Sequence, residues 1–265
     1  MLPPRLLHGA TFLTYAVAAV LYLANLVKER KPVARAARWT LGGAALLHFS
    51  QLLADWALAG QVPFTDIHGA LTSLALLLVV GYLLVGLRAE MPAAGAFITP
   101  GVLALLVISE FKAPGSTLPA QAGVIRPIHI AMAMVGTAAF FIAFVVAVMY
   151  LVLERALKEK KFGAVYHRFP SLDVLDSVNY RAIVVGFPLL TLGIVTGALF
   201  ARKIDASVSL NASHLQYGLA VLAWLFFAVV LNARITAGWR GRRTALLTIG
   251  GFASALGVLA VYLVR

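Results

Sequence analysis

The side chains best suited to chemistry in this sequence are six histidines, and there is no cysteine. Four of them, His8, His68, His129 and His214, stand at one end of long apolar segments. Neutral imidazole is a good ligand for iron, zinc or copper, and two imidazoles on opposite faces of a porphyrin would hold haem iron without a thiolate. Two interpretations stay open for each residue: a metal or haem ligand, or an interfacial histidine whose ring tip reaches water.

A second polar feature lies inside an apolar segment. His48, Gln51 and Asp55 are spaced by three and four residues, which places them on one face of a helix. His48 lies ~16 Å from the end of that helix, near mid-membrane. Polar groups at this depth are costly, face the interior and mark sites. The stripe is interpreted as a haem ligand with supporting partners, as a proton path, or as an interhelical hydrogen-bonded clamp, and Glu110 and Asp66 are predicted nearby.

The other reactive residue types exclude several kinds of chemistry. Without cysteine there are no disulfides, thiolate metal sites or thiol redox steps. Most acidic residues fall in loops, which argues against a zinc transporter, because such a protein buries several carboxylates with its histidines. There is no nucleophile–base pair at a recognisable spacing, so covalent catalysis by this chain alone is not expected.

The elements that must position these residues are membrane-spanning helices. The chain of 265 residues is 62% hydrophobic and 12% charged, and its apolar residues form long uninterrupted blocks. We therefore predict an all-α polytopic membrane protein forming a single domain over residues 1–265. The first apolar block, residues 11–26, is predicted to be a retained helix rather than a cleaved signal. Eight transmembrane helices are expected at 8–27, 38–59, 67–87, 93–111, 128–153, 182–200, 213–233 and 244–264.

The distribution of basic residues predicts the orientation. One alternate set of loops carries 16 of the 22 lysines and arginines, and the other set, with the termini, carries 6. The positive-inside rule places the first set in the cytoplasm and both termini outside, on the periplasmic side. The net charge of +12 thus sets topology, and we expect no nucleic-acid partner.

Two of the predicted cytoplasmic loops have distinctive sequences. Residues 154–181 include His167 and are basic in their first part. Ser171, Asp173 and Asp176 could cap a short interfacial helix that leads into the segment 182–200, and an ordinary linker is the alternative. The segment 238–243 reads Gly-Trp-Arg-Gly-Arg-Arg. Its Trp239 is expected at the headgroup level, with Arg240, Arg242 and Arg243 contacting lipid phosphate or a partner.

Several motifs of the second half occur in an order that is typical of one family. They are Pro-Ile-His-Ile-Ala-Met-Ala-Met at 127–134, Leu-Asp-Ser-Val-Asn-Tyr-Arg at 175–181 and Gly-Phe-Pro-Leu-Leu-Thr-Leu-Gly-Ile-Val-Thr-Gly at 186–197. They are followed by Ala-Trp-Leu-Phe at 223–226 and the segment 238–243. Together they resemble the cytochrome c assembly family of the CcsA/CcmC type, in particular its HemX-like and YpjD-like branch.

The resemblance implies a haem site. In this family haem is held at the outer face by two histidines that flank a tryptophan-rich loop, two further histidines lie within the membrane, and haem is delivered to apocytochrome c. By resemblance, His129 occupies the first outer position and His48 the first intramembrane position. The sequence departs from the pattern elsewhere. Residues 201–213 contain no tryptophan, Asn232 stands at the second intramembrane position, and the nearest substitute for the second outer histidine, His214, does not match in position.

We therefore predict a protein of the bacterial inner (plasma) membrane that handles haem b in cytochrome c assembly or haem biosynthesis. The predicted haem residues are His129, His48, His68 and His214, with Gln51 and Asp55 in support. Expected partners are membrane lipid and apocytochrome c or other cytochrome-maturation proteins. One alternative is a HemX-type scaffold whose basic loops regulate glutamyl-tRNA reductase. Another is a small-solute or ion transporter that uses the stripe around Asp55.

Overall fold

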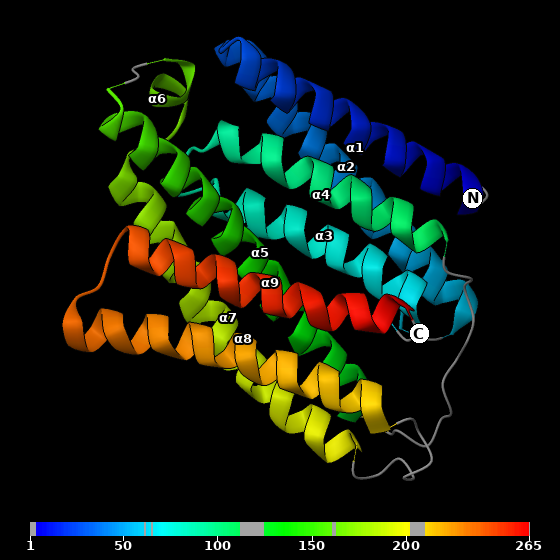
Figure 1. The fold of residues 1–265 in the computed structure, drawn as a ribbon. Coiled ribbons are helices and arrows are strands. Elements are labelled where there is room, and N and C mark those ends of the chain that lie inside the picture. The colour runs from blue at the N-terminus through cyan, green and yellow to red at the C-terminus, as the bar shows by residue number, and fades with distance from the viewer. Residues whose placement is uncertain are drawn as a thin grey trace. The chain divides into compact units, whose positions relative to one another are not determined.

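The computed structural model describes residues 4–60, 62–64, 66–111, 125–160, 163–201 and 210–264. Within these ranges all regular secondary structure is helical (Figure 1). The helices are α1 (Pro4–Val27), α2 (Lys31–Ala59), α3 (Ile67–Val85), α4 (Pro92–Glu110), α5 (Ile125–Lys158), α6 (Ala164–Arg168), α7 (Leu172–Ala201), α8 (Leu210–Ala237) and α9 (Arg242–Val264).

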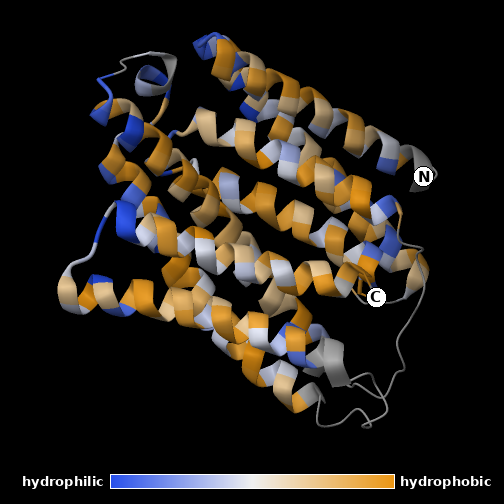
Figure 2. Ribbon diagram, viewed as in Figure 1, coloured by the Kyte–Doolittle hydropathy of each residue, from blue (hydrophilic) through white to orange (hydrophobic). Residues whose placement is uncertain are grey.

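Seven of the described helices are long and apolar enough to cross a membrane: α1, α3, α4, α5, α7, α8 and α9. In Figure 2 hydrophobic residues run along these helices and hydrophilic residues gather near helix ends, for example where α9 begins. The chain is thus an all-helical polytopic membrane protein, as predicted. Although α2 has 29 residues, its polar stripe makes it less apolar. Its membrane crossing, the count of eight and the outward termini stay predictions.

The helices extend further than the apolar blocks that predicted them. α2 begins at Lys31 rather than at 38, α5 continues to Lys158, and α7 begins at Leu172 rather than at 182. The prediction counted apolar residues only, whereas a helix can continue through basic turns whose side chains reach the headgroup region. The ends follow local signals: Gly60 closes α2 in the left-handed conformation (φ 66°), and the Asp66 side chain caps α3 by accepting from Gly69 N at 2.6 Å.

The short helix that Ser171, Asp173 and Asp176 were predicted to cap is the beginning of α7, and its interfacial position stays a prediction. Ser171 accepts a hydrogen bond from Val174 N (3.4 Å) at the start of α7, and Asp173 lies in the first turn of α7. The prediction of Asp176 as a cap is wrong. This carboxylate lies inside α7 and pairs with Arg234 of α8, a partner 58 residues away that no local pattern indicates.

The chain divides into two compact units. Unit 1 is Met1–Leu118 with Arg155–Pro170, and unit 2 is Pro119–Glu154 with Ser171–Arg265. The single domain over residues 1–265 stays a prediction. In unit 1, α1 packs on α2 and α4, and α3 packs on α4. Gly95 of α4 permits a close approach, because a Cβ there would lie 2.5 Å from the ring of Tyr22 on α1.

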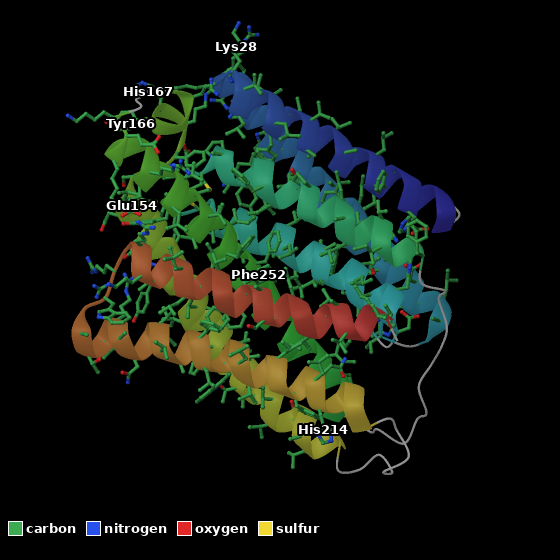
Figure 3. The ribbon with its side chains drawn as sticks, viewed as in Figure 1. Lys28, Glu154, Tyr166, His167, His214 and Phe252 are labelled. Carbon is green, nitrogen blue, oxygen red and sulfur yellow. The ribbon has the colours of Figure 1, made fainter. Side chains whose placement is uncertain are left out.

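The core of unit 2 is aromatic. Phe140 of α5 stacks on Phe227 of α8 with ring centroids 3.8 Å apart, and Phe252 of α9 completes the cluster (Figure 3). α8 packs on both α7 and α9. Lipid is as apolar as these side chains, so helix association here depends on tight packing and on small residues such as Gly186, whose Cβ would lie 2.6 Å from the Phe140 ring.

Candidate functional site

His129 lies near the start of α5 and is held against α7. Its Nδ1 lies 2.8 Å from the carbonyl oxygen of Gly193 and 3.2 Å from the hydroxyl of Thr196. A Cβ at position 197 would lie 2.9 Å from His129 Cε1, so Gly197 leaves room for the ring. The imidazole therefore packs on the glycine-containing face of α7, within unit 2.

These contacts determine the tautomer of His129. A carbonyl oxygen can only accept, so Nδ1 carries the proton and donates to Gly193. The neutral ring then has its lone pair on Nε2, which makes no hydrogen bond within the described chain. Metal-ligating histidines are held in this way, because an anchored N–H orients the ring and raises the basicity of the other nitrogen.

His214 lies at the same end of unit 2. It is exposed in the first turns of α8, near the helix end in Figure 3. Three residues further along α8, Tyr217 donates to the carbonyl oxygen of Gly197 (3.2 Å). Since Gly197 also abuts His129, the beginnings of α5 and α8 both lie against the end of α7. Two of the four histidines proposed for haem thus flank one helix end.

The other predicted site residues gather in unit 1, around His8. His8 Nε2 lies 2.5 Å from Glu110 Oε1 of α4, and its Nδ1 lies 2.7 Å from the amide nitrogen of Gln51 on α2. The His68 ring of α3 is 6.1 Å away, centroid to centroid, and its Nδ1 donates to the carbonyl of Ser109 (3.0 Å). Asp55 adds a carboxylate that interacts with His8, His68 and Gln51.

His48 is fully buried in the same unit. Its ring has 0% exposed surface, and its Nδ1 lies 3.2 Å from the hydroxyl of Tyr15 on α1. The sequence correctly predicted the common face of His48, Gln51 and Asp55. It missed Thr11 and Tyr15 of α1, whose only signal is that His8, Thr11 and Tyr15 follow one another at spacings of three and four residues.

The remaining predicted residues lie away from these two groups of histidines. His167 is exposed in α6 beside Tyr166, Asn232 is exposed on α8, and Asp66 caps α3. In the described parts of the chain, no three side chains of the histidine, aspartate or glutamate type are grouped so that they could hold a metal ion. Predicted residues in the loop 112–124, such as Lys112, lie outside the described residues.

The turn between α8 and α9 is fixed by a buried ion pair. Arg234 donates two hydrogen bonds to Asp176, at 3.1 and 2.7 Å, and Asp176 also accepts from Gly241 N at 3.1 Å. The guanidinium lies 4.3 Å from the Tyr180 ring centroid. Gly238 and Gly241, both with positive φ (63° and 77°), let the chain reverse here.

The basic residues of this turn remain outside the ion pair. The predicted contact residues Arg240, Arg242 and Arg243 are exposed, and Trp239 is half-buried, with the guanidinium of Arg243 lying 5.4 Å above its ring. Their contact with lipid or a partner stays a prediction.

A polytopic helical membrane protein with a histidine anchored at a helix end is the class that fold and site define. The family described as "Cytochrome C assembly protein" matches residues 45–265 of the chain. The chain therefore belongs to the cytochrome c assembly protein family, as its motifs predicted. Membership in the HemX-like branch stays a prediction.

Curated relatives agree with this family. A "Cytochrome c biogenesis protein CcsA" of Prochlorococcus marinus (strain MIT 9301) is 29% identical over 245 residues, covering 82% of this chain and 77% of the relative. The protein of the same name from Guillardia theta is 28% identical over 267 residues, covering 92% and 88%. That of Synechococcus sp. (strain CC9902) is 29% identical over 235 residues, covering 78% and 77%.

Proposed function

We propose that this chain acts in cytochrome c biogenesis by holding haem at the His129 end of unit 2. Family membership and the names of the curated relatives support the process. The observation that supports the site is the hydrogen bond from His129 Nδ1 to Gly193 O (2.8 Å), with the Nε2 lone pair bonded to no described residue.

Haem, most simply haem b, is the cargo in this proposal, and its iron takes an imidazole nitrogen as an axial ligand. His129 supplies that nitrogen from a ring that Gly193 orients and Gly197 accommodates. His214 is the nearest candidate within unit 2 for a second ligand or for a contact to the porphyrin edge. His68 belongs to unit 1, and its part in haem binding stays a proposal that rests on the sequence.

His48 is a weaker candidate for this role. Its ring has no exposed surface, so a porphyrin could approach it only after α1 and α2 had separated. The thiols that bond to haem in a c-type cytochrome must come from the client, because this chain contains no cysteine. Its partners would then be apocytochrome c and other maturation proteins, at the bacterial plasma membrane.

The purified chain in detergent, reconstituted with haem, should show a Soret band, and His129→Ala should lose most of it. Added imidazole should restore part of the band in that variant, because a free ligand can enter the space that the ring leaves. His167→Ala is the matched control, since it removes an exposed histidine of α6. Equal haem binding by the native chain and His129→Ala would contradict the proposal.

Neither alternative function gains support. The named relatives concern cytochrome c biogenesis, and no described contact favours a scaffold for glutamyl-tRNA reductase. The stripe that suggested transport is closed by hydrogen bonds between His8, Gln51 and Glu110.

A further inference from the structure

Among the described residues of unit 1, three buried side-chain atoms lack a hydrogen-bond partner. They are Thr11 Oγ1, His48 Nε2 and Gln51 Oε1, and their residues are 1%, 0% and 3% exposed. A buried polar atom without a partner is costly, and each one in a native structure needs an explanation. Such groups indicate a bound molecule that satisfies them.

The three atoms lie in one stretch of the α1–α2 contact. His8, Thr11 and Tyr15 follow one another at spacings of three and four on α1, so they share a face. Across the contact, His8 bonds to Gln51 (2.7 Å) and Tyr15 bonds to His48 (3.2 Å). Because Thr11 lies between His8 and Tyr15 on that face of α1, we infer that it lies between these two cross-helix bonds.

The Glu110 carboxylate determines which atom donates in each hydrogen bond of this group. The carboxylate of Glu110 can only accept, so His8 donates to it from Nε2 (2.5 Å). In the neutral ring Nδ1 of His8 then accepts, and the amide N–H of Gln51 donates to it. The Gln51 amide nitrogen is thus bonded to His8, whereas the carbonyl oxygen of the same side chain is one of the three atoms without a partner.

We propose that one internal water molecule occupies this site between α1 and α2 and bridges Thr11, His48 and Gln51. His48 donates to it from Nε2, and the water donates its two protons to Gln51 Oε1 and Thr11 Oγ1. A buried water typically makes about three hydrogen bonds, which matches the three unpartnered atoms. This inference goes beyond the proposed function and does not rest on it.

With this water the polar residues form one continuous chain of hydrogen bonds. Tyr15 donates to His48, His48 to the water, the water to Gln51, Gln51 to His8, and His8 to Glu110. Every bond runs in the same sense and the last acceptor carries a charge, so each bond strengthens its neighbour. The chain holds His48 as the Nε2–H tautomer, in which its Nε2 has no lone pair for a metal. His48 is thereby a positioning residue that joins α1 to α2.

Thr11→Val tests whether the site is wet, because the two possibilities predict opposite signs. If water is bound, the variant removes one of its three partners and lowers the melting temperature of the whole chain in detergent, by roughly 2–4 °C. If the site is dry, the variant removes an unsatisfied hydroxyl and raises the melting temperature. Thr99→Val is the matched control, because Thr99 is equally buried and its hydroxyl is satisfied by Gly95 O at 2.8 Å within its own helix.

A second measurement uses the native sequence and needs no variant to be stable. In chain labelled with ¹⁵N-histidine and embedded in lipid, the Nε2 signal of His48, identified by its loss in His48→Gln, should be that of a protonated nitrogen. It should also show magnetisation transfer from water. A bare Nε2, a protonated Nε2 with no water contact, or a Thr11→Val variant that melts higher than the native chain would each overturn the proposal.

Discussion

At the scale of single residues, two glycines of α7 decide how the His129 ring is held. Gly193 supplies the carbonyl oxygen that fixes the tautomer, and Gly197 supplies the space, since its Cβ would lie 2.9 Å from the ring. Nothing lies within 4 Å of a Cβ built at Gly193. A methyl group added at Gly197 would contact the His129 ring, whereas one added at Gly193 would affect only the helix.

We expect Gly197→Ala to weaken haem binding by about 10–100-fold, the usual effect of disturbing the groups that orient a ligand. The added methyl pushes the ring away from Gly193 and breaks the Nδ1 hydrogen bond. Titration of the purified chain with haem, followed by the Soret band, measures the change. Gly193→Ala adds the same methyl one turn earlier, favours the helix by the same small amount, keeps the carbonyl and should bind as the native chain does. Equal losses in both variants would show that helix packing, not the ring, is responsible.

The residue scale also shows the limit of sequence reasoning. The sequence identified His129 through its surrounding motif, and periodicity placed His48, Gln51 and Asp55 on one face. It did not indicate that Gly193, 64 residues away, would accept from His129, or that Tyr15 would meet His48. Local spacing determines which side chains share a face, but packing between helices decides which faces meet.

At the scale of elements, the Asp176–Arg234 pair joins three helices of unit 2. Both side chains are about nine-tenths buried, and the carboxylate also accepts from the backbone at Gly241, just before α9. The pair thus fixes the ends of α7, α8 and α9 relative to one another.

Asp176→Asn should lower the free energy of unfolding by about 3 kcal/mol, because it leaves the buried guanidinium of Arg234 without a counter-charge. The amide keeps the volume of the side chain and an oxygen for Gly241, so the loss measures the charge. Thermal unfolding in detergent gives the change. Arg155→Gln disrupts an exposed pair with Glu159 (2.7 Å) and should leave the melting temperature unaltered. A similar shift in both variants would refute the role assigned to burial.

The sequence predicted the presence of the helices better than it predicted where each helix begins and ends. All eight predicted segments are helical, because a long apolar run can satisfy its backbone in a membrane only as a helix. The additional turns at Lys31 and Lys158 were not predicted, since charged side chains there were assigned to loops. The Asp176–Arg234 pair was missed for a related reason: both residues lie near predicted helix ends, where charge is ordinary.

At the scale of the whole molecule, the topology depends on whether α2 crosses the membrane. The other long helices of the described chain are apolar enough to span, whereas α2 carries His48, Gln51 and Asp55. Its partners compensate for this polarity, because His8 and Tyr15 of α1 bond to the stripe and shield it from lipid. Polar groups that face a neighbouring helix are compatible with a spanning segment, and we therefore expect α2 to cross.

The absence of cysteine makes this expectation testable by single-cysteine labelling. Lys28 lies in the turn after α1 (Figure 3), and Leu87, 71% exposed, lies in the turn after α3. If α2 and α3 both cross, Lys28→Cys and Leu87→Cys share the cytoplasmic side, and an impermeant maleimide labels them only after the cells are opened. Phe111→Cys, one span further and 82% exposed in the native chain, should react in intact cells. If α2 does not cross, Lys28→Cys and Leu87→Cys must react from opposite sides, because a single span then separates them.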